Sequence, residues 1–216
     1  MMNTMEGLRL DRLVVATPDG RSRGVNLTVG PGRLLTVGPE RSEAGAVEAT
    51  ASAMMLARVV VGLVAPRSGR IHVDDRDVTD LPPEQRKIGY VPAGGALLPQ
   101  WTVWQNIAYG LRATDIPEPE AHGRVSTAVK GLELGSTRDV RPHLLTDAQR
   151  LRVALARAAV SLPSVLVVEL PTLVSGAERL NDLAVLAMPL DEPRGPAVLV
   201  CTDDPNVPDE ILPRVP

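Results

Sequence analysis

Three apolar runs in this 216-residue chain are each followed by residues that could take part in chemistry. Gly38 and Pro39 follow the first run, Glu169 follows the second, and Asp203 follows the third. A glycine turn at a strand end can cradle a phosphate with backbone N–H groups, and carboxylates can hold a cation. Each feature also has an interpretation without a ligand: an ordinary strand-end turn for Gly38 and Pro39, and an arginine partner for Glu169.

A second pattern opens the clearest helix of the sequence, at 145–160. Thr146 is followed three residues later by Gln149, which is the spacing of a capping box. In that motif a hydroxyl and an amide each satisfy a free backbone N–H group at a helix start. Helix capping is therefore the favoured explanation of both residues. The basic side chains of this helix are expected on its solvated face: Arg150, Arg152 and Arg157.

The elements that must position these residues alternate between strands and helices. Period-two patterns and short apolar runs predict strands at 8–15, 23–30, 33–38, 70–75, 87–91, 165–168 and 197–202. Helical patterns cover 54–63, 102–113, 119–134, 145–160 and 177–188, and a proline-initiated helical turn falls at 81–86. Strands that alternate with helices in the second half predict an α/β fold with a largely parallel sheet.

Composition excludes several classes of protein. The net charge of −3 argues against a general nucleic-acid binder, which would carry a basic surplus. The single cysteine, Cys201, cannot form an intramolecular disulfide, so we expect a cytoplasmic location and a buried thiol in an apolar strand. The best apolar stretch, at 53–65, is interrupted by Arg58 and is too short to span a membrane. The N-terminus lacks the charged-then-apolar pattern of a signal peptide.

Aromatic residues are few and lie close together. The chain has no Phe, and its aromatic residues are Tyr90, Trp101, Trp104 and Tyr109. Tyr and Trp are enriched in binding hot spots. Core packing is the better interpretation for Tyr90, which lies in a predicted strand. For Trp101 and Trp104, which flank a predicted helix start, partner docking and core packing are equally good interpretations.

Four segments, in this order, resemble the ATPase subunit of an ATP-binding-cassette (ABC) transporter: RLLTVGP, GLVAPRSGRIHVDDRDVTDLPPEQRKIGYV, ALLPQWTVWQNIAYGL and AQRLRVALARAAVSLPSVLVVELPT. In sequence, these segments are most similar to the importer branch that serves sugars, polyamines and inorganic anions. The resemblance implies a P-loop NTPase-like α/β fold with an antiparallel N-terminal β-subdomain, a mostly parallel core sheet and a helical signature subdomain. It also implies a single domain over 1–216, with the Q-loop and the helical subdomain at about 93–160.

The family's Walker A motif, GxxxxGK[ST], does not occur in this chain. That motif needs glycines for close backbone approach, a lysine at the phosphates and a hydroxyl on Mg²⁺. Counting from Gly38 puts Glu43, Ala44 and Gly45 at the second glycine, the lysine and the hydroxyl. Counting back from the following helix puts the same three positions at 52–54. Neither count finds a lysine, because the chain has only Lys87 and Lys130.

The Q-loop and signature positions also depart from the family pattern. The Q-loop glutamine, which in the family senses Mg²⁺ and the transport partner, corresponds to Ala93. The signature LSGGQ corresponds to 145–149, where Thr146 and Gln149 keep a hydroxyl and an amide but Asp147 replaces a glycine.

The resemblance places Glu169 at the Walker B aspartate and Leu170 at the glutamate that polarises the attacking water. Leucine cannot accept a proton, so the general-base role is vacant. The switch histidine corresponds to Asp203. The expected phosphate site thus gathers acidic residues, with Arg41 the cation nearby in sequence.

From this resemblance we expect an ABC cassette-like subunit that does not hydrolyse ATP and acts as a structural or regulatory partner. Its partners would be a membrane permease and a second cassette, as a homodimer or a heterodimer, at the inner face of the cell membrane. No cofactor is expected, and ATP and Mg²⁺ would bind only if the degenerate site still accepts them. Two alternatives remain: an ATPase that uses non-standard residues, and a soluble regulatory protein outside transport.

Overall fold

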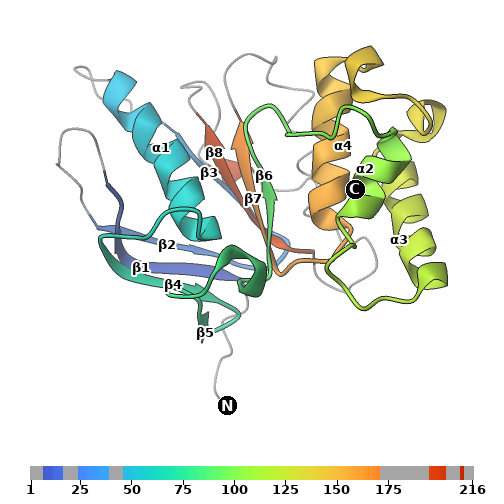
Figure 1. Cartoon of the computed structure of the whole chain (residues 1–216). Coiled ribbons are helices and arrows are strands. Elements are labelled where there is room, and N and C mark those ends of the chain that lie inside the picture. The colour runs from blue at the N-terminus through green and yellow to red at the C-terminus, as the bar shows by residue number, and fades with distance from the viewer. Residues whose placement is uncertain (1–6, 17–23, 39–45, 171–194, 203–209, 212–216) are drawn as a thin grey trace.

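The computed structural model describes residues 7–16, 24–38, 46–170, 195–202 and 210–211. Two sheets and two groups of helices make up this part of the chain (Figure 1). The predicted helix at 177–188 lies outside the described residues. Within them, no helix is both long and apolar enough to cross a membrane.

The first sheet is antiparallel, with the strand order β2-β1-β4-β5. Its strands are β1 (Leu8–Val14), β2 (Val25–Val29), β4 (Ser68–Val73) and β5 (Arg76–Asp77). Leu8 and Leu10 of β1 are buried, whereas the alternating residues Arg9 and Asp11 face outward. This alternation is the period of two that the sequence showed, and it confirms the predicted antiparallel subdomain.

The second sheet has the strand order β6-β7-β8-β3-β9. Four of its strands are parallel: β3 (Leu34–Val37), β6 (Ile88–Val91), β7 (Val165–Leu170) and β8 (Ala197–Thr202). The short β9 (Glu210–Ile211) pairs antiparallel with β3 and was not predicted. All residues of β7 and β8 are buried, because both faces of the sheet are covered.

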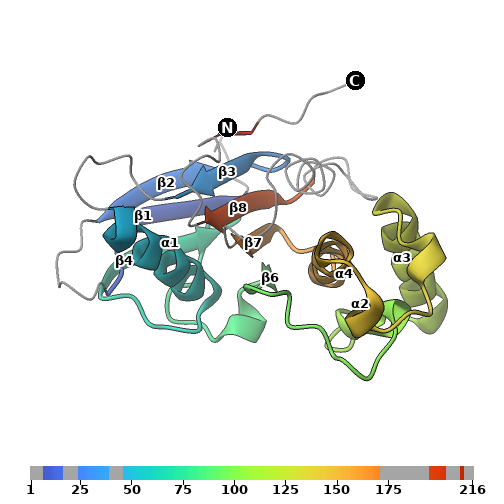
Figure 2. The ribbon, with the colours of Figure 1, turned by 90° about the horizontal axis from the view of Figure 1, so that it is seen from above.

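One face of the parallel sheet packs on helix α1 (Ala46–Val61) and on the antiparallel sheet. The other face packs on α4 (Asp147–Ala159), and α2 (Val103–Tyr109) and α3 (Glu118–Gly131) pack against α4 and complete this core. Successive residues of β7 alternate between the two cores: Val165 and Val167 lie on the α1 side, and Leu166 and Val168 on the other. Figure 2 shows the parallel sheet between these layers. The layering confirms the predicted α/β class.

Helices α1 and α2 differ most in length from the sequence prediction. Helix α1 begins at Ala46, before the predicted 54–63, and α2 ends at Tyr109, short of residue 113. Beyond α2 the backbone continues in tight turns, in which Leu111 and Arg112 donate to carbonyls three residues earlier. Three single 3₁₀ turns complete the helical elements: η1 (Pro83–Gln85), η2 (Gly135–Thr137) and η3 (Pro142–Leu144). The first is the predicted proline-initiated turn.

Arg86 ties the end of α1 to the antiparallel sheet. It is only 4% exposed, and burial lowers the pKa of its guanidinium. Its N–H groups donate to four backbone carbonyls, at 2.8 to 3.0 Å, from Val59, Val60, Thr79 and Leu81. Two of these carbonyls belong to the last turn of α1, where the helix supplies few donors, and that of Val59 also accepts from the N–H of Gly62 at 3.1 Å. Gly62 has φ +90°, and a Cβ there would lie 2.6 Å from Nε of Arg86.

We expect Arg86→Met to lower the free energy of unfolding by at least about 3 kcal/mol, because it leaves several buried carbonyls without donors. Urea denaturation followed by circular dichroism measures this. Arg70→Ala is the matched control, since Arg70 is exposed and pairs with Asp77 and Asp80 at the surface. Its cost should stay within about 1 kcal/mol, and equal losses in the two variants would contradict this role of Arg86.

Candidate functional site

The carboxylate of Glu169 lies at the end of β7 with only 2% of its side chain exposed. Its Oε1 accepts a hydrogen bond from the Tyr90 hydroxyl at 2.7 Å. The same oxygen forms an ion pair with Arg58, whose Nε lies 3.4 Å away. Its Oε2 accepts a hydrogen bond from the backbone N–H of Ala93 at 3.0 Å. Both oxygens of this buried carboxylate are therefore engaged by groups of the protein itself.

Arg58 is the cation that balances Glu169, and its side chain is half exposed on α1. The expected arginine partner of Glu169 is thus confirmed, but the sequence did not identify which arginine it is, since Arg58 lies 111 residues away. Arg41 lies outside the described residues. A signal for Arg58 existed, because it is the charged residue that interrupts the apolar run at 53–65.

Tyr90 supplies the short hydrogen bond to Glu169. Burial, and next the neighbouring carboxylate, raise the pKa of the Tyr90 phenol well above its usual range, so the hydroxyl stays protonated and can donate. The predicted core packing of Tyr90 is seen in its contact with the core on the α1 side. The hydrogen bond from its hydroxyl to Glu169 was not predicted.

Leu170 follows Glu169 and is 3% exposed in the core on the α2–α4 side. Its side chain holds no atom that can accept a proton or orient a water molecule. Its backbone carbonyl accepts a hydrogen bond from the hydroxyl of Thr202 in β8 at 2.8 Å. The residue next to the strand-end carboxylate is thus part of the apolar core.

The positions of a phosphate loop are only partly described. Gly38 follows β3 directly, whereas Pro39, Glu43, Ala44, Gly45 and Asp203 lie outside the described residues. Helix α1 begins at Ala46, immediately after the positions counted from Gly38. The alternative count from the helix reaches Ala53, which is 2% exposed within α1.

Thr146 and Gln149 form the predicted capping box at the start of α4. The Thr146 hydroxyl accepts from the N–H of Gln149 at 3.2 Å, and the Gln149 side-chain oxygen accepts from the N–H of Thr146 at 2.9 Å. Asp147 pairs with Arg150 in the same turn. The local structure therefore accounts for Thr146 and Gln149 without a ligand, as the sequence favoured.

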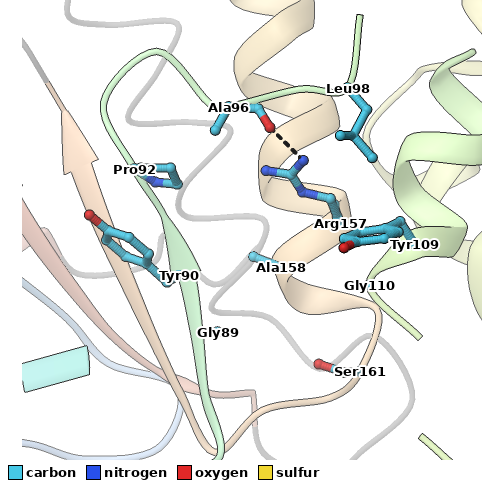
Figure 3. Close-up of a pocket in the computed structure, with 10 residues that line it drawn as sticks. All are labelled: Gly89, Tyr90, Pro92, Ala96, Leu98, Tyr109, Gly110, Arg157, Ala158 and Ser161. Carbon is cyan, nitrogen blue, oxygen red and sulfur yellow. Dashed lines mark hydrogen bonds between the residues drawn. The ribbon is translucent and has the colours of Figure 1, made fainter. Parts of the chain in front are cut away.

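An open pocket of about 490 Å³ lies between β6, the segment 92–98, α2 and α4. Its walls include Tyr90 and Pro92 on one side, and Leu98 and Tyr109 on the other (Figure 3). Tyr109 is 44% exposed, so an aromatic ring borders the pocket at the surface. The lining is largely apolar, with the Arg157 side chain between its walls.

The prediction that Arg157 lies on a solvated face is wrong. Its guanidinium is half-buried and donates to the carbonyls of Gly95 at 2.6 Å and Ala96 at 2.8 Å. Burial lowers the pKa of Arg157. Helical periodicity identified the face of α4 but could not show that segment 92–98 covers it.

The two tryptophans lie next to the pocket and do not line it. Trp101 packs edge-on against Tyr109, with ring centroids 5.4 Å apart. Trp104 contacts the His122 ring at 4.8 Å, and the Arg138 guanidinium lies 4.0 Å from its centroid. Both indoles are half-buried, and Trp104 packs against the core of α2–α4. Core packing therefore accounts for most of the contacts of the Trp104 side chain. Trp101 instead packs against Tyr109, the aromatic ring that borders the pocket.

Comparison with known proteins gives one family and several relatives. The model of the ABC transporter family matches residues 54–172, which run from within α1 past the end of β7. The spermidine/putrescine import ATP-binding protein PotA of Vibrio vulnificus is 37% identical over 146 residues, which are 67% of this chain and 36% of that protein. The sn-glycerol-3-phosphate import ATP-binding protein UgpC of Bordetella avium is 43% identical over 116 residues, 54% of this chain and 32% of that protein. The chain thus spans about a third of the length of these curated relatives.

Solved structures share the fold. A dimeric post-hydrolysis structure of the ATP-binding cassette MJ0796, bound to ADP and Pi, has a TM-score of 0.67 at 21% identity. That alignment covers 92% of this chain and 89% of MJ0796. The cbiO1 protein of Clostridium perfringens, part of the transporter complex cbiONQ, has a TM-score of 0.66 at 22% identity, over 90% of this chain and 77% of cbiO1.

We expect Tyr90→Phe to lower the free energy of unfolding by about 2 kcal/mol, because a buried carboxylate loses a hydrogen-bond donor. Thermal or urea unfolding measures the loss. Tyr109→Phe is the matched control, since it removes a hydroxyl from an exposed tyrosine of the same pocket. The control should stay within about 0.5 kcal/mol of the wild type, and a Tyr90→Phe protein of unchanged stability would contradict the role of this hydrogen bond.

Proposed function

The chain belongs to the ABC transporter ATP-binding domain family, and on that premise we propose that it is a cassette subunit that docks a membrane permease without hydrolysing ATP. The observation that carries this proposal is the chemistry at the end of β7. Leu170, an apolar residue in the core, follows the strand-end carboxylate where the family has its general base. Phosphoryl transfer to water requires a residue that orients the attacking water, and this position does not supply one.

The surroundings of Glu169 support the same proposal. ABC ATPase domains in general bind ATP with Mg²⁺, which takes oxygen ligands from carboxylates, waters and phosphates. Here both carboxylate oxygens of Glu169 already accept from protein donors, and one of these is the cation Arg58. A divalent cation at this carboxylate would meet the positive guanidinium and would have to displace it. These residues fit Mg²⁺ poorly.

The pocket supports a docking role. It lies between β6, α2 and α4, and it is open, largely apolar and bordered by the exposed ring of Tyr109. An apolar pocket with an aromatic rim suits the insertion of aliphatic side chains from a partner helix. The proposal is also supported by the resemblance, which implies a permease-docking surface in this same part of the chain.

The relatives indicate the kind of transporter. PotA and UgpC are named as import ATP-binding proteins, for spermidine/putrescine and for sn-glycerol-3-phosphate. We infer that this chain serves an importer of small polar solutes and lies at the inner face of the membrane through its permease. MJ0796 forms a dimer, and we infer that this chain likewise pairs with a copy of itself or with an active cassette.

The docking proposal is tested by retention of a purified permease on the immobilised chain, with the permease of a spermidine/putrescine importer in detergent as the probe. We expect Leu98→Asp to weaken retention at least tenfold, because it places a charge in the apolar pocket. Leu144→Asp is the matched control, since Leu144 is 69% exposed and lies outside the pocket.

Retention by the wild type and by Leu144→Asp, but not by Leu98→Asp, supports docking at the pocket. No retention of this permease by the wild type, or equal retention by both variants, would contradict the proposal.

A further inference from the structure

Segment 92–98 connects the parallel sheet to α2, and three of its residues line the docking pocket: Pro92, Ala96 and Leu98. Its backbone takes left-handed conformations at Gly94 and Gly95, with φ of +76° and +75°, and at Ala96, with φ of +44°. Alanine pays a steric cost in that region, so the surrounding contacts must hold the segment in place. The shape of the pocket therefore depends on what fixes this backbone.

Side chains from three different elements hold the segment. Asn106 of α2 is fully buried and bonds both the N–H and the carbonyl of Leu98, at 2.8 and 3.1 Å. Arg157 of α4 donates to the carbonyls of Gly95 and Ala96. Glu169 of β7 accepts from the N–H of Ala93. The first two residues tie the segment to the helices, and Glu169 ties it to the parallel sheet.

The Glu169 contact links the start of segment 92–98 to the pocket wall on the sheet side. Its acceptor is a buried carboxylate, and such charge-assisted hydrogen bonds, like those that Arg157 donates, are about twice as strong as neutral ones. The same carboxylate accepts from Tyr90, whose ring lines the pocket. One group thus fixes both the start of segment 92–98 and the adjacent wall, while Arg58 balances its charge.

We propose that Glu169 is a positioning residue for the docking pocket, whose carboxylate holds segment 92–98 in its docking conformation with no nucleotide bound. The role of the pocket rests on the proposed function. The consequence is regulatory: the partner surface is assembled by the protein's own contacts, so permease binding does not depend on Mg-ATP.

Hydrogen–deuterium exchange of the purified chain tests this directly, with the amide of Ala93 as the reporter. In the wild type this amide should be protected, and millimolar Mg-ATP should leave its exchange unchanged. Glu169→Met should speed exchange at Ala93 roughly tenfold, since it removes the acceptor while keeping an apolar side chain. Glu169→Gln should retain the protection, because its amide oxygen can still accept from Ala93.

Peptides from β1 are the internal control, and in each variant their exchange should speed much less than that of Ala93 does in Glu169→Met. A wild-type Ala93 amide that is unprotected, or that slows only with Mg-ATP, would overturn the proposal even if Glu169→Met failed to fold. Exchange in Glu169→Met that speeds as much in β1 as at Ala93 would indicate a general loss of stability and would also overturn the proposal. The measurement uses no permease, so its outcome is separate from that of the docking test.

Discussion

The arrangement of this domain depends on one electrostatic constraint, the burial of the Glu169 carboxylate at the end of β7. An ionised carboxylate removed from water costs several kcal/mol unless neighbouring donors and a cation compensate it. Here the donors come from different parts of the chain: Arg58 from α1, Tyr90 from β6 and the backbone of Ala93 just beyond that strand. Satisfying one buried charge therefore fixes α1, the edge of the parallel sheet and the segment leading to the helices relative to one another.

The helical layer is held to the sheet by close backbone approach and by polar contacts. A Cβ at Gly110 would lie 2.1 Å from the carbonyl oxygen of Arg157, and one at Gly89 would lie 2.7 Å from that of Ala158. Both glycines line the pocket, so the same close packing that joins α2, α4 and β6 leaves an opening between them. The pocket is thus a product of this close packing, and Glu169 holds its wall through Tyr90 and Ala93.

Much of the fold could be predicted from the sequence because its signals are local. The apolar runs gave β7 and β8, the alternating runs gave β1 and β2, and the Thr146–Gln149 spacing gave the start of α4. The key contacts of the site could not be predicted, because they join residues far apart in the chain: Tyr90 lies 79 residues from Glu169, and Arg157 lies 61 residues from Ala96. For the same reason Arg157 was wrongly placed on a solvated face. Composition did indicate the missing lysine, a feature that needs no tertiary contact to be recognised.

We propose that this ABC cassette keeps its scaffold and a docking surface while its strand-end carboxylate is committed to the protein itself. Titration calorimetry of the purified chain with Mg-ATP, up to millimolar concentration, tests this claim most directly. The account predicts no saturable binding heat over that range, since Glu169 is already paired and the chain has no lysine between residues 38 and 62. Saturable binding with a Kd below about 1 mM, a binding free energy stronger than about −4 kcal/mol, would contradict it.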